Sequence, residues 1–294
     1  MKFISPGILF ITLCCVLAGC GSDEPFKHLV IADSPEMFNV VAPAGGARGS
    51  ASITEGVSYY ITFDDEKRDA TLTINNIQLS PSSPPEIITF SNIVWTYEPG
   101  SHEKRRIIEA AELHSDGAPG ADVTLTDVVI IYTESNELNP EPTAGFYASY
   151  TVDNLYRVTS YPYRVEAFGT TTVSNPDSVV QHMIYYDPVY AISFNPRNFT
   201  ASIHVASLEL AGSGESLVDL DISGLKLGLD PEGYTMQATS SSKVVASTGA
   251  DVSLGDLSAT ANLRDQLDLT FEITVNGKQY LVEAYLPPDL NALQ

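Results

Sequence analysis

The stretch FNPRNFTASIHVASLEL, residues 194–210, repeats the pattern of FDDEKRDATLTINNIQL, residues 63–79. Each residue of the earlier stretch lies 131 positions before its counterpart, as Phe63 does before Phe194. In both stretches a turn follows the phenylalanine, and apolar and polar residues then alternate, which is typical of a half-buried β-strand. The sequence therefore predicts one β-rich unit that is used twice.

Three further pairs of segments match in the same order along the chain. They are residues 90–99 with 222–231, 122–127 with 251–256, and 150–154 with 273–277. A period of about 125–130 residues is too long for a solenoid repeat and suits a duplicated domain. We therefore expect an N-terminal β domain over residues 36–162 and a C-terminal β domain over residues 163–294, with the boundary near Pro162.

The strand pattern of the second copy predicts an all-β fold. Asn276-Gly277 is a strong signal for a tight hairpin between two of these strands. Antiparallel strands with short turns suit either a small barrel or a two-sheet sandwich, and the pattern does not separate the two. The expected strands are residues 165–174, 188–195, 199–210, 217–229, 233–244, 257–264, 267–275 and 278–286.

The composition disfavours one class of partner. The 294 residues include 15 basic and 37 acidic side chains, for a formal net charge of −22. Nucleic-acid binding requires Lys and Arg that neutralise phosphates, so we expect no nucleic-acid partner.

The N-terminus carries the most specific motif. Residues 1–19 have the basic start and the short apolar run of a signal peptide, too short to span a bilayer comfortably. Leu17, Ala18 and Gly19 precede Cys20 as in a bacterial lipobox, in which the cysteine sulfur accepts the lipid. We expect cleavage before Cys20, a lipidated tether over residues 20–35, and a membrane anchor. Residues 21–25, GSDEP, resemble the surface-export signal of Bacteroides-type lipoproteins, with a plain tether as the alternative.

The body of the chain lacks the motifs of common catalytic sites. All three cysteines lie within the first 20 residues, which excludes a cysteine nucleophile or disulfide in the body. The five histidines are scattered without helical zinc spacing, and no Gly-x-Ser-x-Gly elbow or phosphate-binding glycine loop is present. We therefore expect no catalytic residues, no metal, no cofactor and no enzymatic activity.

Tyrosine is frequent, with 15 residues, and provides the candidate ligand site. Tyrosine rings suit sugars or apolar ligands because they combine a flat apolar face with a polar tip, but they are also common strand residues. The basic run 104–106, KRR, could contact an anion or be a solvated loop. The candidate ligand residues, at the end of the first copy, are Tyr147, Tyr150, Tyr156, Tyr161 and Tyr163.

The lipobox at Leu17–Cys20, the segment FGTTTV at residues 168–173 and the paired β units resemble the tandem lipocalin-like, or calycin-like, lipoproteins of Bacteroidales. The resemblance implies barrel-like domains on the cell envelope, at the outer membrane or cell surface, without inherited catalytic residues. Asp177-Ser178-Val179 also fits the O-glycosylation motif of Bacteroides-type exported proteins, with Ser178 as the acceptor.

Two functions follow from these observations. The first is a non-catalytic, lipid-anchored binding module for a small apolar ligand or a glycan. The alternative is a structural or assembly lipoprotein that acts through protein contacts and has closed cores. An open cavity lined by tyrosine would favour the first function, and barrels filled by their own side chains would favour the second.

Overall fold

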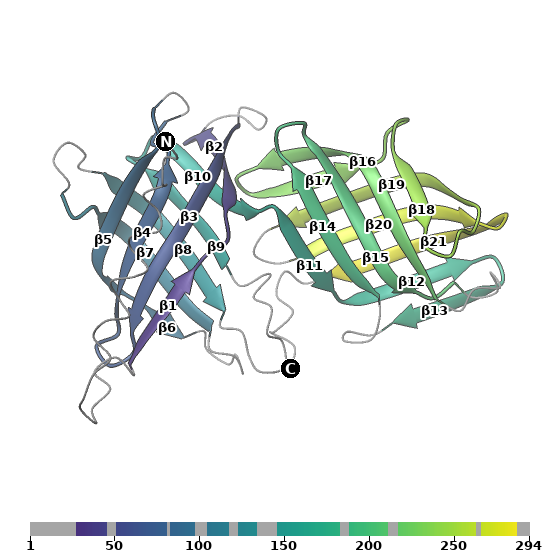
Figure 1. Cartoon of the computed structure of the whole chain (residues 1–294), viewed down its shortest axis with the longest axis horizontal. Helices are drawn as coiled ribbons and strands as arrows, with labels where there is room; N and C mark the ends of the chain where they lie inside the picture. Colours follow the sequence, from purple (N-terminus) through teal and green to yellow (C-terminus); the bar gives the residue numbers. More distant parts are fainter. Residues whose placement is uncertain are drawn as a thin grey trace, which may run out of the picture.

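The computed structural model describes residues 28–45, 51–80, 83–97, 105–117, 123–133, 146–182, 188–210, 217–262 and 266–286. Within these segments the secondary structure consists of strands and turns without a helix, which confirms the all-β prediction. The strands form two sheets, which we call the first and the second domain, and the chain passes from one to the other at Tyr163. The two domains lie side by side in Figure 1.

The first sheet holds ten strands. They are β1 (Leu29–Asp33), β2 (Met37–Pro43), β3 (Ser52–Asp64), β4 (Asp69–Ile77), β5 (Glu86–Val94), β6 (Thr96–Tyr97), β7 (Arg105–His114), β8 (Thr124–Thr133), β9 (Phe146–Val152) and β10 (Tyr156–Pro162).

The second sheet holds eleven strands. They are β11 (Arg164–Phe168), β12 (Thr170–Asn175), β13 (Ser178–His182), β14 (Val189–Asn195), β15 (Thr200–Leu208), β16 (Val218–Asp230), β17 (Gly233–Gln237), β18 (Lys243–Ala246), β19 (Val252–Asn262), β20 (Gln266–Val275) and β21 (Lys278–Leu286).

Each sheet curls because one stretch of chain supplies strands to both of its ends. The first sheet runs β5-β4-β3-β2-β10-β9-β8-β7-β6, and only Trp95 separates β5 from β6. The second runs β11-β14-β15-β16-β17-β19-β20-β21-β12-β13, and only Gly169 separates β11 from β12. Both domains are therefore barrel-like, with every described pairing antiparallel (Figure 1).

The two domains share unusual backbone positions. Arg68 and Phe199, which are 131 positions apart, both have positive φ, at 61° and 51°. Asn76 and Ser207, also 131 apart, have φ of 58° and 59°. Such values are uncommon outside glycine, so their recurrence at equivalent places shows that the same turn and the same bulge occur in both domains.

The hairpin expected at Asn276-Gly277 is present. Asn276 and Gly277 have φ of 49° and 80°, and β20 and β21 pair on either side of them. Two positive φ values in a two-residue loop are what a type I′ turn requires. Asp153 and Asn154 adopt the same conformation between β9 and β10, with φ of 49° and 57°.

Three expectations about the strands need correction. Residues 165–174 form two strands, because the chain changes partner at Gly169. The strand expected over 233–244 ends at Gln237, and β18 then pairs with β16 instead of continuing β17. The tether expected over residues 20–35 already contains β1, because the long strand β3 extends past β2 and offers its far half to Leu29–Asp33.

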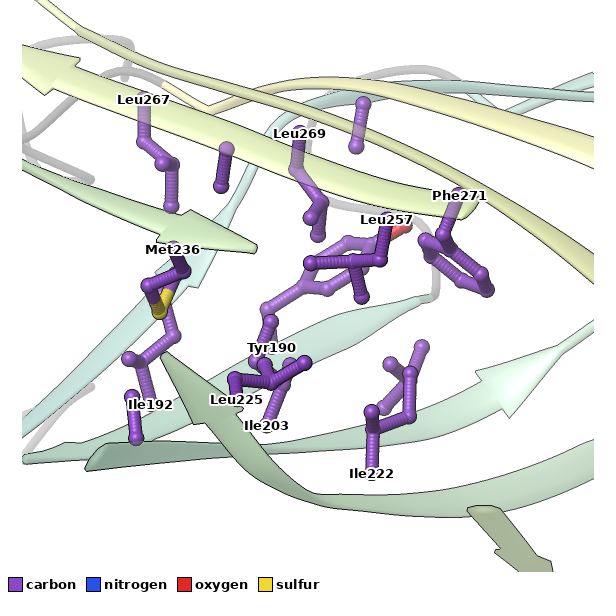
Figure 2. Packing of buried hydrophobic residues seen from close by; sticks show 14 of the residues in the cluster. Tyr190, Ile192, Ile203, Ile222, Leu225, Met236, Leu257, Leu267, Leu269 and Phe271 are labelled. Carbon is purple, nitrogen blue, oxygen red and sulfur yellow. The ribbon is translucent and has the colours of Figure 1, made fainter. Parts of the chain in front are cut away.

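The interior of each domain is an apolar core made by alternate residues of its strands. Figure 2 shows the second core, where Tyr190 and Ile192 of β14 face Leu269 and Phe271 of β20 across the barrel. The first core is centred on Tyr59 and Phe63 in the same way. These cores leave the outer faces and the contact between the domains as the places where function must be sought.

Candidate functional site

Both barrel interiors are closed over their described parts. A cavity wide enough for a ligand would leave solvent-accessible area on the side chains that line it. Yet the central core residues have an exposed fraction of 0%: in the first barrel Tyr59, Ile61, Leu72, Ile74, Phe90, Ile108 and Leu125, and in the second Tyr190, Ile192, Val205, Leu220, Leu225, Met236 and Phe271. The barrels are therefore filled by their own side chains, as small barrels can be.

The five candidate tyrosines do not share one open face. Tyr150 points into the first core and is 1% exposed. Tyr161 is equally buried but belongs to the second core, and Tyr163 packs against that same core. Tyr147 is half-buried, and Tyr156 packs against the first core from its edge. The structure thus brings Tyr161 and Tyr163 together at the domain contact and places Tyr150 elsewhere.

Strands β2 and β10 form a wall that both domains share. Met37 and Val41 of β2 face the first core, whereas Phe38 and Val40 between them face the second core. The Phe38 ring stacks on Tyr161 at 5.4 Å between centroids and meets Phe194 of β14 at 6.3 Å. Burial on both faces explains why β2 has apolar residues on both sides, as central strands do, with the buried Asn39 as the polar exception.

Hydrogen bonds and ion pairs close this contact. The Tyr161 hydroxyl lies 2.6 Å from the carbonyl oxygen of Asp230 and 3.0 Å from that of Gly233. The Thr159 hydroxyl donates to the Pro231 carbonyl at 2.7 Å. Burial raises the pKa of Tyr161 well above its ordinary value, so its hydroxyl stays protonated.

Two ion pairs flank the aromatic contact between the domains. Arg157 of β10 pairs with Glu232 at 2.9 Å. The Arg197 guanidinium pairs with Glu55 of β3, with its Nη2 at 2.6 Å from the carboxylate. Each pair joins one residue of each domain, so the junction is a packed interface rather than a ligand pocket over the described residues.

A polar cluster lies inside the first core. The Tyr59 hydroxyl contacts the Tyr150 hydroxyl at 3.0 Å and the Ser160 hydroxyl, which in turn donates to Asn39 Oδ1 at 2.6 Å. Burial raises the pKa of Tyr59 to about 12 and that of Tyr150 well above its ordinary value. The members satisfy one another, which is the condition for keeping polar groups in a core.

The basic run at residues 104–106 does not behave as a solvated loop where it is described. Arg105 and Arg106 begin β7, and the Arg106 side chain is fully buried. Its guanidinium lies over the rings of Phe63, Trp95 and Tyr97 at 5.1–5.4 Å and pairs with Asp65 at 3.1 Å. Arg106 is thus a structural cation within this end of the first barrel, and Lys104 lies outside the described residues.

A surface pocket of about 210 Å³ lies on the outer face of the second domain. Its lining residues come from β12, the turn after it, β20 and β21: Ser174, Asn175, Pro176, Glu272, Gln279, Tyr280 and Leu281. Gln279 Nε2 donates to Glu272 Oε2 at 3.3 Å, so a carboxylate and an amide are held side by side. This arrangement can accept and donate hydrogen bonds to a polar ligand.

The same outer face continues across the neighbouring strands. Tyr285 of β21 pairs with Thr170 of β12 and Asp268 of β20, and its ring is 51% exposed. Glu283 of β21 lies two residues away, on the same face as Tyr285. The face therefore combines an exposed aromatic ring with carboxylates and hydroxyls beside the pocket.

Ser178 lies in the β12–β13 hairpin, next to this pocket. Asn175 Oδ1 accepts hydrogen bonds from the backbone N–H groups of Asp177 and Ser178, at 2.8 and 2.9 Å, and shapes the turn. The Ser178 hydroxyl is 3.3 Å from the same oxygen. The expected O-glycosylation acceptor thus sits on a hairpin turn at the protein surface.

The described residues contain neither a candidate metal site nor a membrane-spanning helix. Among the described residues, no three His, Cys, Asp or Glu side chains lie close enough together to hold a metal ion. The described segments contain no helix that is long and apolar enough to cross a bilayer. The lipobox residues Leu17, Ala18, Gly19 and Cys20 lie outside the described residues.

The sequence analysis named Tyr161 and Tyr163 but missed the other junction contacts and the pocket. The signal for the junction was the run Met37–Val41, in which four of the five residues are apolar, as in a strand buried on both faces. The pocket had no comparable signal, because its residues come from three strands and a turn. Comparison with protein-family models, curated proteins and solved structures found no match to this chain.

Proposed function

We propose that this chain is a lipid-anchored lipoprotein of the cell envelope that binds a glycan on the outer face of its second domain. The anchor is Cys20. It attaches the protein to the outer membrane, on either the periplasmic or the cell-surface side. No catalytic step is part of this proposal. The likeness to tandem lipocalin-like lipoproteins of Bacteroidales supports the envelope location.

The closed barrels favour a ligand on the outer surface over a ligand inside a barrel. A small apolar ligand would need interior space, and the central side chains of both barrels are at 0% exposure. A polar ligand can bind from outside without opening a core. The pocket of about 210 Å³ is smaller than the roughly 300–1,000 Å³ of sites that enclose drug-sized ligands. The pocket suits one sugar unit of a longer glycan, whose other units contact the surrounding outer face.

The chemistry of this face supports a glycan. Sugars offer many hydroxyls together with apolar C–H faces, so they match carboxylate and amide groups placed near an aromatic ring. Glu272 and Gln279 supply the first within the pocket, and Tyr285, four residues along β21 from Leu281 of the pocket, supplies the second on the same outer face.

Titration calorimetry with a panel of neutral, amino-bearing and acidic oligosaccharides tests this proposal. Glu272→Gln and Tyr285→Ala should each weaken binding at least fivefold while leaving the melting temperature unchanged. Gln237→Ala, an exposed strand residue of β17, is the matched control and should change neither. Binding that survives both substitutions would place the site elsewhere, and a panel without binding would remove the glycan function.

Assembly through protein contacts is the second candidate, and both the filled barrels and the edge strand β13 favour it. Its one neighbour among the described strands is β12, and Val179 on it is 69% exposed. Edge strands of this kind can accept a strand from another protein. A Val179→Lys substitution should abolish partner capture in crosslinking on cells, and unchanged crosslinks would exclude this edge.

The domain architecture forms the last part of this proposal. We infer that the two domains arose by internal duplication. The support is the match of segments along the sequence together with the recurrence of the Arg68/Phe199 and Asn76/Ser207 backbone conformations.

A further inference from the structure

The first described residue lies against the turn between β3 and β4. The His28 carbonyl oxygen accepts a hydrogen bond from the backbone N–H of Asp65 at 2.8 Å, and Leu29 pairs with Asp64. The chain therefore enters the first domain at this end. The short strand β6 and the buried Arg106 lie at the same end, because Arg106 pairs with both Tyr97 and Asp65 (Figure 1).

The length of the preceding chain limits how far this end can lie from an anchor. Cys20 precedes His28 by eight positions. A fully extended chain covers at most about 3.5 Å per residue, which gives about 28 Å, and a flexible chain covers about half of that on average. An anchor at Cys20 therefore keeps the β3–β4 turn close to the bilayer; this step rests on the lipidation that is part of the proposed function.

The two cations of this turn differ from each other. The Lys67 side chain is 69% exposed, but its Nζ pairs with the Asp64 carboxylate at 3.2 Å. Arg68 is also exposed, and its guanidinium lies 4.8 Å from the Trp95 ring and 4.7 Å from the Tyr97 ring. Among the described residues, no carboxylate lies within ion-pair distance of Arg68, although the chain carries 37 acidic residues.

Two acidic groups of the turn, Asp64 and Asp65, are engaged, whereas the Glu66 side chain is 76% exposed. Asp64 accepts hydrogen bonds from the backbone N–H groups of Glu66 and Lys67, which lower its pKa. Asp65 is held by Arg106. The equivalent turn of the second domain has Phe199 in place of Arg68, and its Arg197 is occupied by Glu55. The β3–β4 turn therefore has an exposed guanidinium stacked on aromatic rings, and the equivalent turn of the second domain does not have one at the matched position.

We propose that the β3–β4 turn rests on the membrane that holds the anchor, with Arg68 contacting phosphate groups of the phospholipids. Arginine donors match phosphate oxygens. Residues 64–69 hold two basic and four acidic side chains, so this orientation follows from the short tether and the exposed Arg68 guanidinium and not from the net charge of the turn.

Energy transfer in vesicles tests this orientation. The full lipoprotein is reconstituted in 3:1 phosphatidylethanolamine–phosphatidylglycerol vesicles that carry a headgroup acceptor. A donor dye is placed on Glu66→Cys or, in the equivalent turn of the second domain, on Asn198→Cys, one position after the match of Glu66. The body has no cysteine of its own, so each variant carries one free thiol. Transfer from position 66 should be at least twofold more efficient than from position 198, and equal transfer would overturn the orientation.

Arg68 is then tested separately. Arg68→Gln should reduce transfer from position 66, whereas Lys243→Gln, with the same loss of charge, should leave it unchanged. Unaltered transfer in Arg68→Gln, with an unaltered β-type circular dichroism spectrum as proof of folding, would overturn the headgroup contact. Protein that fails to float with the vesicles would instead refute the anchor at Cys20, and with it this orientation.

Discussion

The hydroxyl of Tyr161, at the end of the first domain, lies 2.6 Å from the carbonyl oxygen of Asp230 in the second domain. Asp230 is the last residue of β16. The Tyr161 hydroxyl of the first domain therefore satisfies a backbone carbonyl where a strand of the second domain ends. Tyr285, on the outer face of β21 in the second domain, is instead 51% exposed. The same residue type is thus structural at the junction and available on the outer face.

Loss of the Tyr161 side chain should uncouple the unfolding of the two domains. Tyr161→Phe removes one buried hydrogen-bonding group and should cost about 1 kcal/mol, while Tyr161→Ala also leaves a cavity and should cost about 3–5 kcal/mol. Calorimetry should show one transition for the wild type and two for Tyr161→Ala. Tyr285→Ala is the control, with a change below about 0.5 kcal/mol. A single unshifted transition in Tyr161→Ala would contradict a coupled junction.

The first domain should lose stability in alkali. Tyr59 has a pKa of about 12 in the folded protein and about 10 when unfolded, so the stabilisation is complete below pH 10 and is lost as the pH rises toward 12. The shift corresponds to roughly 3 kcal/mol at the upper end of that range. Denaturant titrations followed at pH 9 and pH 12 measure it. Tyr59→Phe should make the first domain less sensitive to alkali, and equal sensitivity in both proteins would argue against this source.

Arg106 should be far more important for stability than an exposed arginine. Its side chain is fully buried, and its removal leaves Asp65 without its ion-pair partner, so Arg106→Ala should cost about 3–5 kcal/mol. Arg157→Ala breaks the exposed pair with Glu232 and should cost less than about 1 kcal/mol. Urea unfolding followed by Trp95 fluorescence reports both, because Trp95 is the single tryptophan of the chain. Similar costs for the two variants would contradict a structural role for Arg106.

The anchor at Cys20 can be tested in cells. Cys20→Ala should abolish incorporation of a palmitate analogue and release the protein from the membrane fraction, because the sulfur is the expected lipid acceptor. Ser22→Ala, two residues away, should leave both unchanged. Labelling that persists in Cys20→Ala would exclude lipidation at this residue.

The second domain should fold alone but less stably than in the whole chain. A fragment of residues 164–294 keeps the complete second sheet, including the Asn276-Gly277 hairpin. It loses Phe38, Val40 and Tyr161, which belong to the second core. Circular dichroism should show β structure with a cooperative melt at a lower temperature than in the full chain. A disordered fragment would mean that the shared wall is required for folding.

Local pattern was enough to predict the strands and the hairpin. The alternation in residues 200–208 and the Asn276-Gly277 pair each specify their structure through neighbours in the chain, so the all-β class and most strand positions could be derived without coordinates. The places where this failed are those where the partner is remote. Gly169 interrupts a strand because its two halves pair with β14 and β21, which lie near opposite ends of the sheet and are separated by five strands.

The sequence by itself determined the all-β class of fold, because the alternation that specifies a strand depends on residues close together in the chain. Tertiary structure alone decided what the tyrosines do. Tyr150 and Tyr161 look alike in sequence. In the structure, the side chain of Tyr150 points into the first barrel, whereas that of Tyr161 points outward and packs against the second domain. It also decided that the barrels are filled and that Glu272 lies beside Gln279, because packing and side-by-side strands bring together residues that the chain keeps apart.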